Sequence, residues 1–488
     1  MSDALPVMMH ATDAAAWMAG AHLVGPDAAI RRVTTDSRAV QPGDLFVALI
    51  GERFDAHGFL PDVVARGAAA VLVSRRPADM PDLPDLPDLS GVAVLSVADT
   101  RIALGQLAAG WRRRFPIPVV AVTGSNGKTT VKEMISAVFA CAVGEAARLA
   151  TAGNLNNDIG LPLTLFRLTA QHRLAVLELG MNHPGETEVL AAIAQPTVAL
   201  INNAQREHQE FMVSVEAVAA EHAAVLAALP ADGVAVFPRD AANGGEYAPL
   251  WRAAAGTRRV LDFGIEGGAV SAAVTDTADG QRIDVHAPDL RFSFTLPLLG
   301  VHNARNALAA TACALAAGIA PEVIAQALSA FAPVKGRLQR KPGHHGGLVI
   351  DDTYNANPDS VRAAIDALAT LPAPRWLVLG DMGEVGTQGP AFHREIGAYA
   401  RERGIDAVLA TGELARHMVE AFGGGARHFA SAEALIEQGV PAIAPGATVL
   451  VKGSRFMRME RIVDALVLKD PAADSQGAPG TTHTQQTH

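Results

Sequence analysis

A loop with the residues for holding phosphate is the strongest chemical signal in the sequence. The segment "TGSNGKTT", residues 123–130, follows an apolar run that predicts a strand and precedes a stretch with helical spacing. Glycines in such a loop let backbone N–H groups turn toward phosphate oxygens, while the lysine reaches the terminal phosphates and the next hydroxyl binds Mg²⁺. The first glycine of the usual pattern falls on Val122, so the loop is a variant. It predicts phosphate binding and lacks the G-x-G-x-x-G spacing that a dinucleotide loop needs. The alternative is a Gly/Ser turn followed by a chance Lys-Thr pair.

Two other polar residues follow predicted strands of the same region. Glu178 ends the run "LAVLEL", and His208 follows the run "TVALINN". The carboxyl ends of parallel strands meet at one edge of a sheet, where α/β proteins bind ligands. Glu178 and His208 are therefore candidates for ligand binding. The alternative for Glu178 is a solvated carboxylate at a strand end, and the alternative for His208 is an ordinary loop histidine.

Short β-rich runs alternate with Ala-rich helical patterns along most of the chain. Continuous apolar strands separated by helices predict an α/β fold with parallel sheets buried on both faces. We expect three α/β domains and a disordered tail: residues 1–111, a central P-loop ATPase-type parallel sheet at 112–331, a doubly wound Rossmann-like domain at 332–470, and a polar tail at 471–488. A Pro-Asp-Leu repeat at 80–90 predicts an extended surface insert, because its prolines exclude helix and central strand.

Composition excludes several classes of protein. The 488 residues carry 40 Lys and Arg against 50 Asp and Glu, a net charge of −10, which argues against nucleic-acid binding. Cys141 and Cys313 are far apart and outside any metal-binding spacing, so we expect core thiols of a reducing compartment. The first residues lack the basic region of a signal peptide, and no apolar run reaches the length of a membrane span. We therefore expect a cytoplasmic protein.

The phosphate loop is one of a series of motifs along the chain. The others are "GNLNNDIGLPLTL" (153–165), "LELGMNHPGE" (177–186), "HNARNALAA" (302–310), "DDTYNANPDS" (351–360), "LGDMGEVG" (379–386) and "VKGSR" (451–455). In their order and spacing, over roughly residues 30–465, the chain resembles the Mur ligase family, which builds the peptide stem of peptidoglycan. Within that family, residues 35–59 and the run "YNANPDS" most resemble the member that adds the final dipeptide.

The resemblance implies an ATP-dependent ligase with Mg²⁺ as cofactor. It would join D-alanyl-D-alanine to UDP-N-acetylmuramoyl-tripeptide, in cytoplasmic synthesis of the cell-wall precursor on which cell shape and division depend. In this family ATP turns the carboxylate into an acyl phosphate, which the incoming amine attacks with release of phosphate. We expect a monomer with no nucleic-acid or membrane partner.

The resemblance also implies the site residues. The catalytic residues are Lys128, as the clamp on the γ-phosphate, Glu178 and His208; the metal ligands are Thr129, Glu178 and His208. The ATP-binding residues are Thr123, Gly124, Ser125, Asn126, Gly127, Lys128, Thr129, Thr130, Asn303, Arg337, Asp352 and Tyr354. The substrate-binding residues are Ser37, Arg38, Asn154, Asn156, Asn157, Asn355 and Asn357. Of these, Ser37 and Arg38 would bind the UDP moiety, which makes residues 1–111 the UDP-sugar-binding domain. Three alternatives stay open: a surface ion pair for Arg38, an Asx-rich turn for the loop at 154–157, and a helix cap for Asn303.

One departure from the family concerns a lysine. Many Mur ligases carry a carbamoylated lysine about fourteen residues past the metal-binding histidine, and this spacing leads to His222. The sequence has no lysine between Leu168 and Lys335. We therefore predict that the carbamate is absent or that another group replaces it. His222 would then be a metal ligand or a hydrogen-bond donor.

Three other functions are alternatives to this one. A Mur ligase adding the third amino acid usually carries an Asp-Asn-Pro-Arg motif, which this sequence lacks. A folate-polyglutamate ligase would not need the segment at 35–59. A P-loop nucleotide switch without ligase chemistry would hydrolyse ATP slowly, whatever carboxylate and amine are offered.

Overall fold

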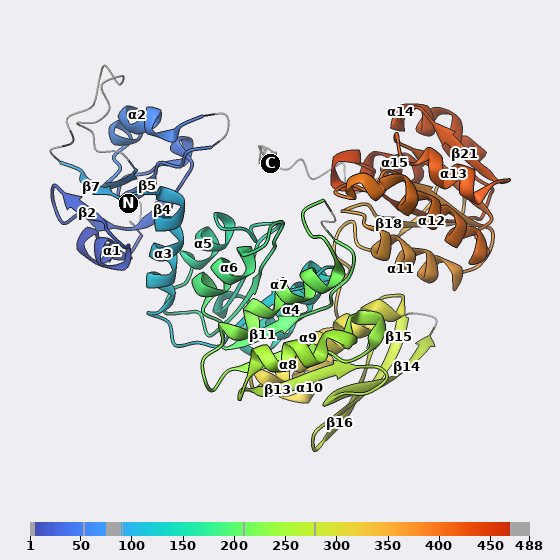
Figure 1. Ribbon diagram of the computed structural model, residues 1–488, viewed down its shortest axis with the longest axis horizontal. Helices are drawn as coiled ribbons and strands as arrows, with labels where there is room; N and C mark the ends of the chain where they lie inside the picture. Colours follow the sequence, from blue (N-terminus) through green and yellow to red (C-terminus); the bar gives the residue numbers. More distant parts are fainter. Residues whose placement is uncertain are drawn as a thin grey trace. The chain divides into compact units, whose positions relative to one another are not determined.

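The computed structural model describes residues 5–51, 54–74, 89, 91–207, 210–277 and 280–468. Most of the Pro-Asp-Leu repeat, His208 and the predicted tail lie outside these residues. Contacts divide the chain into two compact units, Met1–Ala332 and Pro333–His488 (Figure 1). The predicted boundary near residue 112 falls within the first unit and stays a prediction. In the described residues, no helix is long and apolar enough to cross a membrane.

The first unit begins with a five-stranded sheet of order β2-β7-β6-β5-β4. Its strands are β2 (His22–Val24), β4 (Arg32–Thr34), β5 (Asp44–Val47), β6 (Ala70–Val73) and β7 (Ala93–Ser96). A short antiparallel pair and three helices accompany it: β1 (Met9–His10), β3 (Ala29–Ile30), α1 (Ala11–Trp17), α2 (Leu60–Ala65) and α3 (Thr100–Arg112). Strands β4 to β7 are parallel, and only β2 pairs antiparallel. Every residue of β5, β6 and β7 is buried, as expected for strands covered on both faces.

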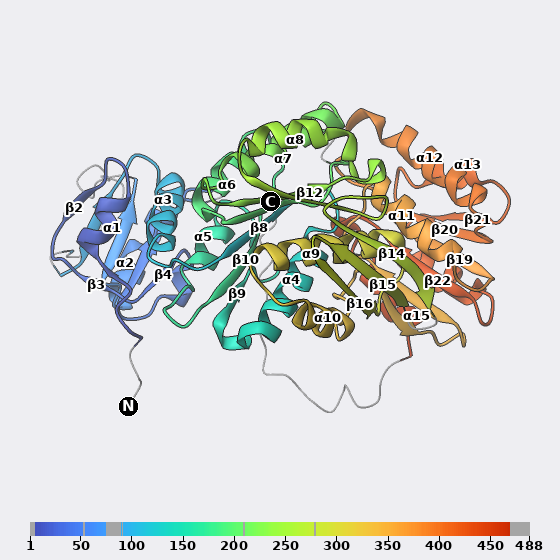
Figure 2. The same cartoon turned by 90° about the horizontal axis from the view of Figure 1, so that it is seen from below.

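A nine-stranded sheet forms the rest of the first unit, in the order β16-β15-β14-β13-β12-β11-β8-β10-β9. Its strands are β8 (Val119–Thr123), β9 (Arg148–Ala150), β10 (Leu174–Glu178), β11 (Val198–Ile201), β12 (Val234–Pro238), β13 (Arg259–Gly264), β14 (Val270–Thr277), β15 (Gly280–Ala287) and β16 (Leu290–Leu296). Its helices are α4 (Lys128–Val143), α5 (Gly160–Leu165), α6 (Glu186–Ala194), α7 (Val215–Ala227), α8 (Ala248–Ala255), α9 (Val301–Ala316) and α10 (Pro321–Ser329). Figure 2 shows α7 and α8 on one side of the strands and α4, α9 and α10 on the other.

The direction in which strands are added reverses at β8. The chain passes from β8 to β9 and β10 on one side, and then to β11, β12 and β13 on the other. Ligands of open α/β sheets bind at the carboxyl end of the strands where such a reversal occurs. The antiparallel strands β14, β15 and β16 at the far edge are a feature that the sequence interpretation did not include.

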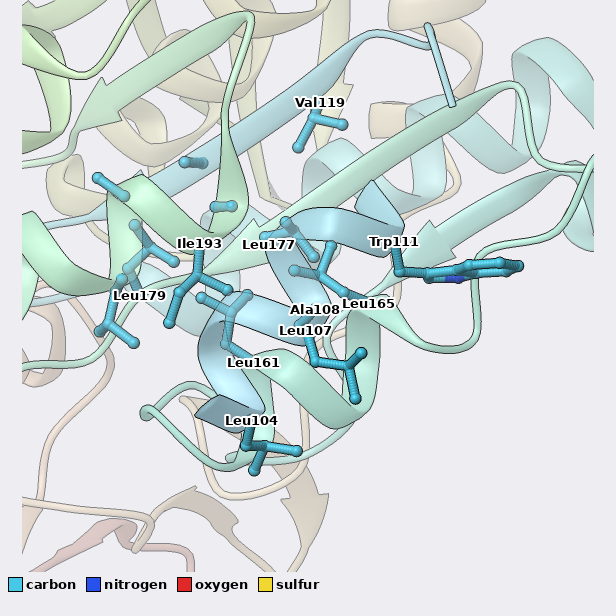
Figure 3. Packing of buried hydrophobic residues seen from close by; sticks show 14 of the residues in the cluster. Leu104, Leu107, Ala108, Trp111, Val119, Leu161, Leu165, Leu177, Leu179 and Ile193 are labelled. Carbon is cyan, nitrogen blue, oxygen red and sulfur yellow. The ribbon is translucent and has the colours of Figure 1, made fainter. Parts of the chain in front are cut away.

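Helix α3 packs against the helices beside the nine-stranded sheet. Leu104, Leu107 and Trp111 of α3 belong to one buried cluster with residues of α5 and α6 (Figure 3). The Trp111 indole N–H donates to the carbonyl of Leu168 at 3.2 Å. Gly105 lets α3 approach closely, because a Cβ there would lie 2.7 Å from Cδ1 of Ile193. The chain therefore enters β8 from a helix that is fixed to the same core.

The second unit is a six-stranded sheet of order β17-β18-β22-β19-β20-β21. Its strands are β17 (Gln339–Pro342), β18 (Leu348–Asp352), β19 (Arg375–Leu379), β20 (Ala407–Thr411), β21 (Ala426–Phe429) and β22 (Thr448–Lys452), and its helices are α11 (Pro358–Ala369), α12 (Gly389–Glu402), α13 (Arg416–Phe422), α14 (Ala432–Ala434) and α15 (Glu460–Leu466). Only β17 pairs antiparallel.

Alternate residues of the strands in the second unit feed two separate cores. Ile350 and Leu450 pack in a cluster with α11, α12 and α13, whereas Val349 and Val449 pack on the opposite face with α15. Successive side chains of a strand point to opposite faces, so two apolar faces need two layers of helices. The doubly wound sheet predicted for this region is therefore confirmed.

Candidate active site

The phosphate loop joins β8 to the first turn of α4, as the sequence predicts. Gly124 and Gly127 take positive φ angles of 134° and 77°, a region that residues with a Cβ rarely adopt. Gly127 is also crowded, since a Cβ there would lie 2.7 Å from Oδ1 of Asn306 and 2.8 Å from Nδ2 of Asn202. The loop thus needs glycine for its conformation and for the close approach of the side chains behind it.

Two asparagines after β11 hold the middle of the loop. Asn203 accepts from the N–H of Asn126 at 2.8 Å, and its own amide donates to the Asn126 carbonyl at 2.8 Å. Asn202 donates to the same carbonyl at 2.7 Å and to Oδ1 of Asn306 at 3.0 Å. Sequence analysis did not select Asn202 or Asn203. The signal for them was present, because they directly follow a buried strand beside β8.

The predicted loop residues differ in exposure. Thr123, Gly124, Ser125 and Thr130 are buried, whereas Asn126, Gly127, Lys128 and Thr129 are partly exposed. Ser125 donates its hydroxyl to the carbonyl of Gln205 at 3.2 Å and accepts from the Gln205 N–H at 2.9 Å. The accessible part of the loop therefore includes the lysine and the adjacent hydroxyl assigned to phosphate and Mg²⁺.

The ammonium of Lys128 lies over its own loop. It donates to the carbonyls of Gly124 and Ser125 and lies 3.4 Å from Oε2 of Glu207. The side chain of Lys128 is 17% exposed and that of Glu207 is 5% exposed. A carboxylate that sequence analysis did not select thus pairs with the predicted clamp on the γ-phosphate.

His222, at the position where the resemblance places a lysine in other members, is completely buried in α7. Its Nε2 lies 3.1 Å from Oε1 of Glu207, and its Nδ1 lies 3.0 Å from the hydroxyl of Thr123. Because a carboxylate only accepts, Nε2–H is the donor to Glu207. The Thr123 hydroxyl is the hydrogen-bond partner of Nδ1 on the other side of the ring. Of the two roles left open for His222, the structure shows the hydrogen-bond donor.

The preceding residue of α7 faces a different element. Glu221 accepts from the N–H groups of Gly185 and Thr187, each at 2.8 Å, at the start of α6. A carboxylate at this place satisfies backbone donors that the helix leaves unpaired and complements the helix dipole. Glu221 and His222 are adjacent on α7 but reach different elements.

Glu178 lies beside the phosphate loop. It ends β10 in register with Val122 of β8, and the N–H of Leu179 donates to the Val122 carbonyl at 2.8 Å. Its Oε1 accepts from Nδ2 of Asn156 at 2.8 Å, whereas its Oε2 is buried with no hydrogen-bond partner. An unpartnered buried carboxylate oxygen is costly unless a cation or donor completes it.

Glu178 therefore fits a magnesium site beside the phosphate loop. Mg²⁺ takes few protein carboxylates and completes its shell with phosphate and water oxygens. Within the described ranges, no group of three or more His, Cys, Asp and Glu side chains gathers around a possible metal position. Thr129 is adjacent to the loop lysine, and His208 lies outside the described residues, so both ligand assignments stay predictions.

The asparagines of the predicted loop, which follows β9, differ in their surroundings. Asn154 is exposed. Asn156 orients Glu178, as given above, and Asn157 accepts from the N–H groups of Ile159 at 3.3 Å and Gly160 at 2.8 Å. For Asn157, the Asx turn that we considered is thus observed. Contact of this loop with a substrate stays a prediction.

Asn303 and Asn306 lie on one face of α9, as their spacing predicts. Nδ2 of Asn306 donates to Oδ1 of Asn303 at 3.2 Å, and Nδ2 of Asn303 donates to the Leu299 carbonyl at 2.8 Å. Asn306 thereby links α9 to Asn202 and the phosphate loop. The nucleotide contact of Asn303 stays a prediction.

Ser37 and Arg38 begin a short helical turn after β4. Arg38 is 70% exposed and forms an ion pair with Asp36 at 2.9 Å. Hydrogen bonding to Arg38 lowers the pKa of Asp36, and hydrogen bonding to Asp36 raises the pKa of Arg38. The surface ion pair that we weighed is thus present, while a contact of Ser37 or Arg38 with UDP stays a prediction.

In the second unit, the predicted ATP-binding residues lie near one another. Asp352 forms an ion pair with Lys452 at 2.7 Å, and the Lys452 ammonium also donates to the Asn355 carbonyl at 2.8 Å. Burial raises the pKa of Asp352, and the charge of Lys452 opposes this shift.

The guanidinium of Arg337 lies over the Tyr354 ring, 4.2 Å from its centroid. Asn357 caps α11 by accepting from the N–H of Ser360 at 2.8 Å. Their ligand contacts stay predictions.

The geometry places a cation and a carboxylate at the carboxyl ends of β8 and β10. Lys128 can neutralise terminal phosphate oxygens, and Glu178 can hold a metal ion against the same phosphates. Such an arrangement serves phosphoryl transfer, in which positioning and charge neutralisation supply most of the catalysis.

Comparisons with known proteins agree with this geometry. Three family models match in succession: the Mur ligase family catalytic domain over residues 29–112, the Mur ligase middle domain over 122–314 and the Mur ligase glutamate ligase domain over 336–455. The UDP-N-acetylmuramoyl-tripeptide–D-alanyl-D-alanine ligase of Escherichia coli (strain K12) is 41% identical over 449 residues, which cover 91% of this chain and 95% of that protein.

Solved structures give the same result. A crystal structure of MurF from Acinetobacter baumannii matches with a TM-score of 0.86 at 35% identity, covering 94% of this chain and 99% of that one. MurF ligase from Thermotoga maritima in complex with ADP matches with a TM-score of 0.77 at 26% identity, covering 89% and 96% of the two chains. The chain belongs to the Mur ligase family.

Proposed function

We propose that the protein is an ATP-dependent ligase that joins D-alanyl-D-alanine to UDP-N-acetylmuramoyl-tripeptide. The observation that carries the proposal is the 41% identity to the Escherichia coli ligase of that name over 91% of this chain. The phosphate loop and Glu178, side by side in the register of β8 and β10, supply the matching chemistry. This assignment makes the protein a cytoplasmic enzyme of peptidoglycan synthesis. Both cysteines are free thiols; Cys313 is buried as predicted, whereas Cys141 is exposed, so the prediction of a core thiol is wrong for Cys141.

Each residue of the site has a role in this reaction. The backbone N–H groups of the loop and the Lys128 ammonium bind the phosphates of ATP, and Lys128 neutralises charge on the γ-phosphate as it transfers. Thr129 and Glu178 would hold Mg²⁺, with His208 as the third predicted ligand. When bound, Mg²⁺ neutralises phosphate oxygens and orients them for in-line transfer. Asn156 fixes the Glu178 carboxylate by its hydrogen bond at 2.8 Å.

The phosphate is transferred to the carboxylate at the end of the tripeptide. The products of this step are an acyl phosphate and ADP. The step is needed because a carboxylate oxygen alone is too poor a leaving group for amide formation. The amine of D-alanyl-D-alanine then attacks the acyl carbon, and inorganic phosphate leaves. The polar residues at the carboxyl ends of the strands of the second unit, among them Asn355 and Asn357, are the proposed acceptor site.

The acceptor is tested by offering alternatives separately. The purified protein, ATP and Mg²⁺ are combined with UDP-muramoyl-tripeptide and D-alanyl-D-alanine, or with UDP-muramoyl-dipeptide and L-lysine, meso-diaminopimelate or L-glutamate. We expect phosphate release and a mass-identified product chiefly with the tripeptide and D-alanyl-D-alanine. Faster joining of a single amino acid to the dipeptide would identify the ligase for the third residue instead. ATP hydrolysis that no substrate pair accelerates would indicate a nucleotide switch.

A further inference from the structure

A buried carboxylate with no role in the proposed reaction lies next to the phosphate loop. Glu207 follows β11, is 5% exposed, and connects two side chains that are distant in sequence. One carboxylate oxygen lies 3.4 Å from Nζ of Lys128, and the other lies 3.1 Å from Nε2 of His222. A buried charge is retained at a site only where its partners compensate the lost hydration. Two of the partners here are the phosphate-binding lysine and a fully buried imidazole.

The far side of this group is fixed to the strand that carries the loop. Nδ1 of His222 lies 3.0 Å from the hydroxyl of Thr123, the last residue of β8. Thr123, His222, Glu207 and Lys128 therefore form a continuous chain of polar contacts, which begins at the strand and ends at the ammonium. The packing of α7 holds the imidazole, so the position of the carboxylate does not depend on the flexible lysine.

We propose that Glu207, held by His222, is a positioning residue that acts as the counterion of Lys128 until a nucleotide replaces it. The proposal rests on the proposed function, since it assigns Lys128 to the γ-phosphate of ATP. Before binding, the carboxylate keeps the ammonium folded over the loop and charge-balanced. When ATP binds, the ammonium of Lys128 pairs with the γ-phosphate instead of Glu207. The Glu207 carboxylate keeps its hydrogen bond to His222 and remains near the ammonium.

This arrangement predicts a specific effect on affinity. A carboxylate that competes for the ammonium and repels phosphate weakens binding of the γ-phosphate. Removing its charge should therefore tighten binding of a non-hydrolysable ATP analogue relative to ADP, which lacks that phosphate. Turnover should fall in the same variant, because Lys128 loses the group that positions it. If Glu207 had only a structural role, its substitution would change the affinities for the ATP analogue and for ADP by the same factor.

The experiment measures the affinities of the ATP analogue and of ADP, both with Mg²⁺, by calorimetry on the full-length protein. Glu207→Gln should raise the preference for the analogue over ADP about tenfold, the scale of two close unit charges in a water-like dielectric. The same substitution in a Lys128→Ala background should raise the preference less, because the competition for the ammonium is gone and only the repulsion of the phosphate remains. Glu216→Gln, on the exposed face of α7, is the matched control and should behave as wild type.

A second variant tests the other half of the chain of contacts with the opposite sign. His222→Ala removes a donor from Glu207, which should then compete more strongly for Lys128 and lower the preference for the analogue. An unchanged preference in both single variants would overturn the proposal, as would weaker Mg²⁺-dependent binding of both nucleotides in Glu207→Gln, which would make Glu207 a metal ligand. If the wild-type protein bound neither nucleotide, the proposed function itself would fail.

Discussion

Replacing Gly127 by alanine would test how strongly the phosphate loop depends on its shape. Gly127 begins α4 with φ 77° and ψ 0°, in the left-handed region. An alanine in that conformation costs about 1–2 kcal/mol. Its Cβ would also lie 2.7 Å and 2.8 Å from the side chains of Asn306 and Asn202, which are fixed by their own hydrogen bonds. Overpacking of this kind adds about 1–3 kcal/mol.

Gly185 provides the matched control for this substitution. It begins α6 with φ 91° and ψ −14°, the same left-handed class, and a Cβ there meets no atom within 4 Å. Gly185→Ala should therefore cost only the conformational part, about 1–2 kcal/mol. Gly127→Ala should cost about 2–5 kcal/mol, the sum of both terms. Only Gly127→Ala should also weaken nucleotide binding, since it displaces the loop.

The assay is urea unfolding of both variants beside wild type, with nucleotide affinity measured on the folded proteins. The difference between the two alanine variants isolates the contact with the asparagines. Equal losses of stability at the two positions, or unchanged nucleotide affinity in Gly127→Ala, would show that the crowding behind the loop has no energetic effect.

Three other predictions concern charge and protonation. Lys128→Ala should lower kcat at least ~100-fold with the fold intact, the scale of one lost electrostatic donor, and near-wild-type turnover in a folded mutant would refute its assignment. Activity at fixed pH should be the same in degassed and bicarbonate-supplemented buffer, because residues 133–334 contain no lysine to carbamoylate; dependence on bicarbonate would refute this. Burial lowers the pKa of His393 in the folded protein. As pH falls below about 6.5, this histidine is therefore protonated in the unfolded chain before it is protonated in the folded one, and the free energy of unfolding should decrease. Unfolding midpoints from pH 7.5 to 5.5 should therefore fall more steeply for wild type than for His393→Gln, and parallel curves would contradict the reasoning.

The parallel part of the fold was readable because its strands are continuous apolar runs. Strands such as β8 and β10 are buried at every position, and turn residues separate them from helices. Strand β15 was missed because it is covered on one face only. Ile283, Val285 and Ala287 are buried while His286 between them is exposed, which is an alternating pattern. Searching for continuous apolar runs does not detect such a strand.

The site was predictable where chemistry follows from local spacing. The loop glycines, Lys128 and Glu178 are recognisable from the strands that precede them. Glu207 was not, because its meaning depends on Lys128, 79 residues earlier, and on His222, 15 residues later. The division of labour between Asn156 and Asn157 likewise needs coordinates, since both residues are equally suited to a turn or to a carboxylate contact.

Helix α7 is fixed in rotation as well as in position. Its adjacent residues Glu221 and His222 reach the start of α6 on one side and the phosphate loop on the other. An α-helix turns by about 100° per residue, so a single deletion between Val215 and Ala220 would swing both side chains off their partners at once. Insertions and deletions within this stretch of helix should therefore be poorly tolerated. The contacts of Glu221 and His222 together therefore restrict changes in the length of this helix. A substitution of either residue alone would remove only one of the two contacts.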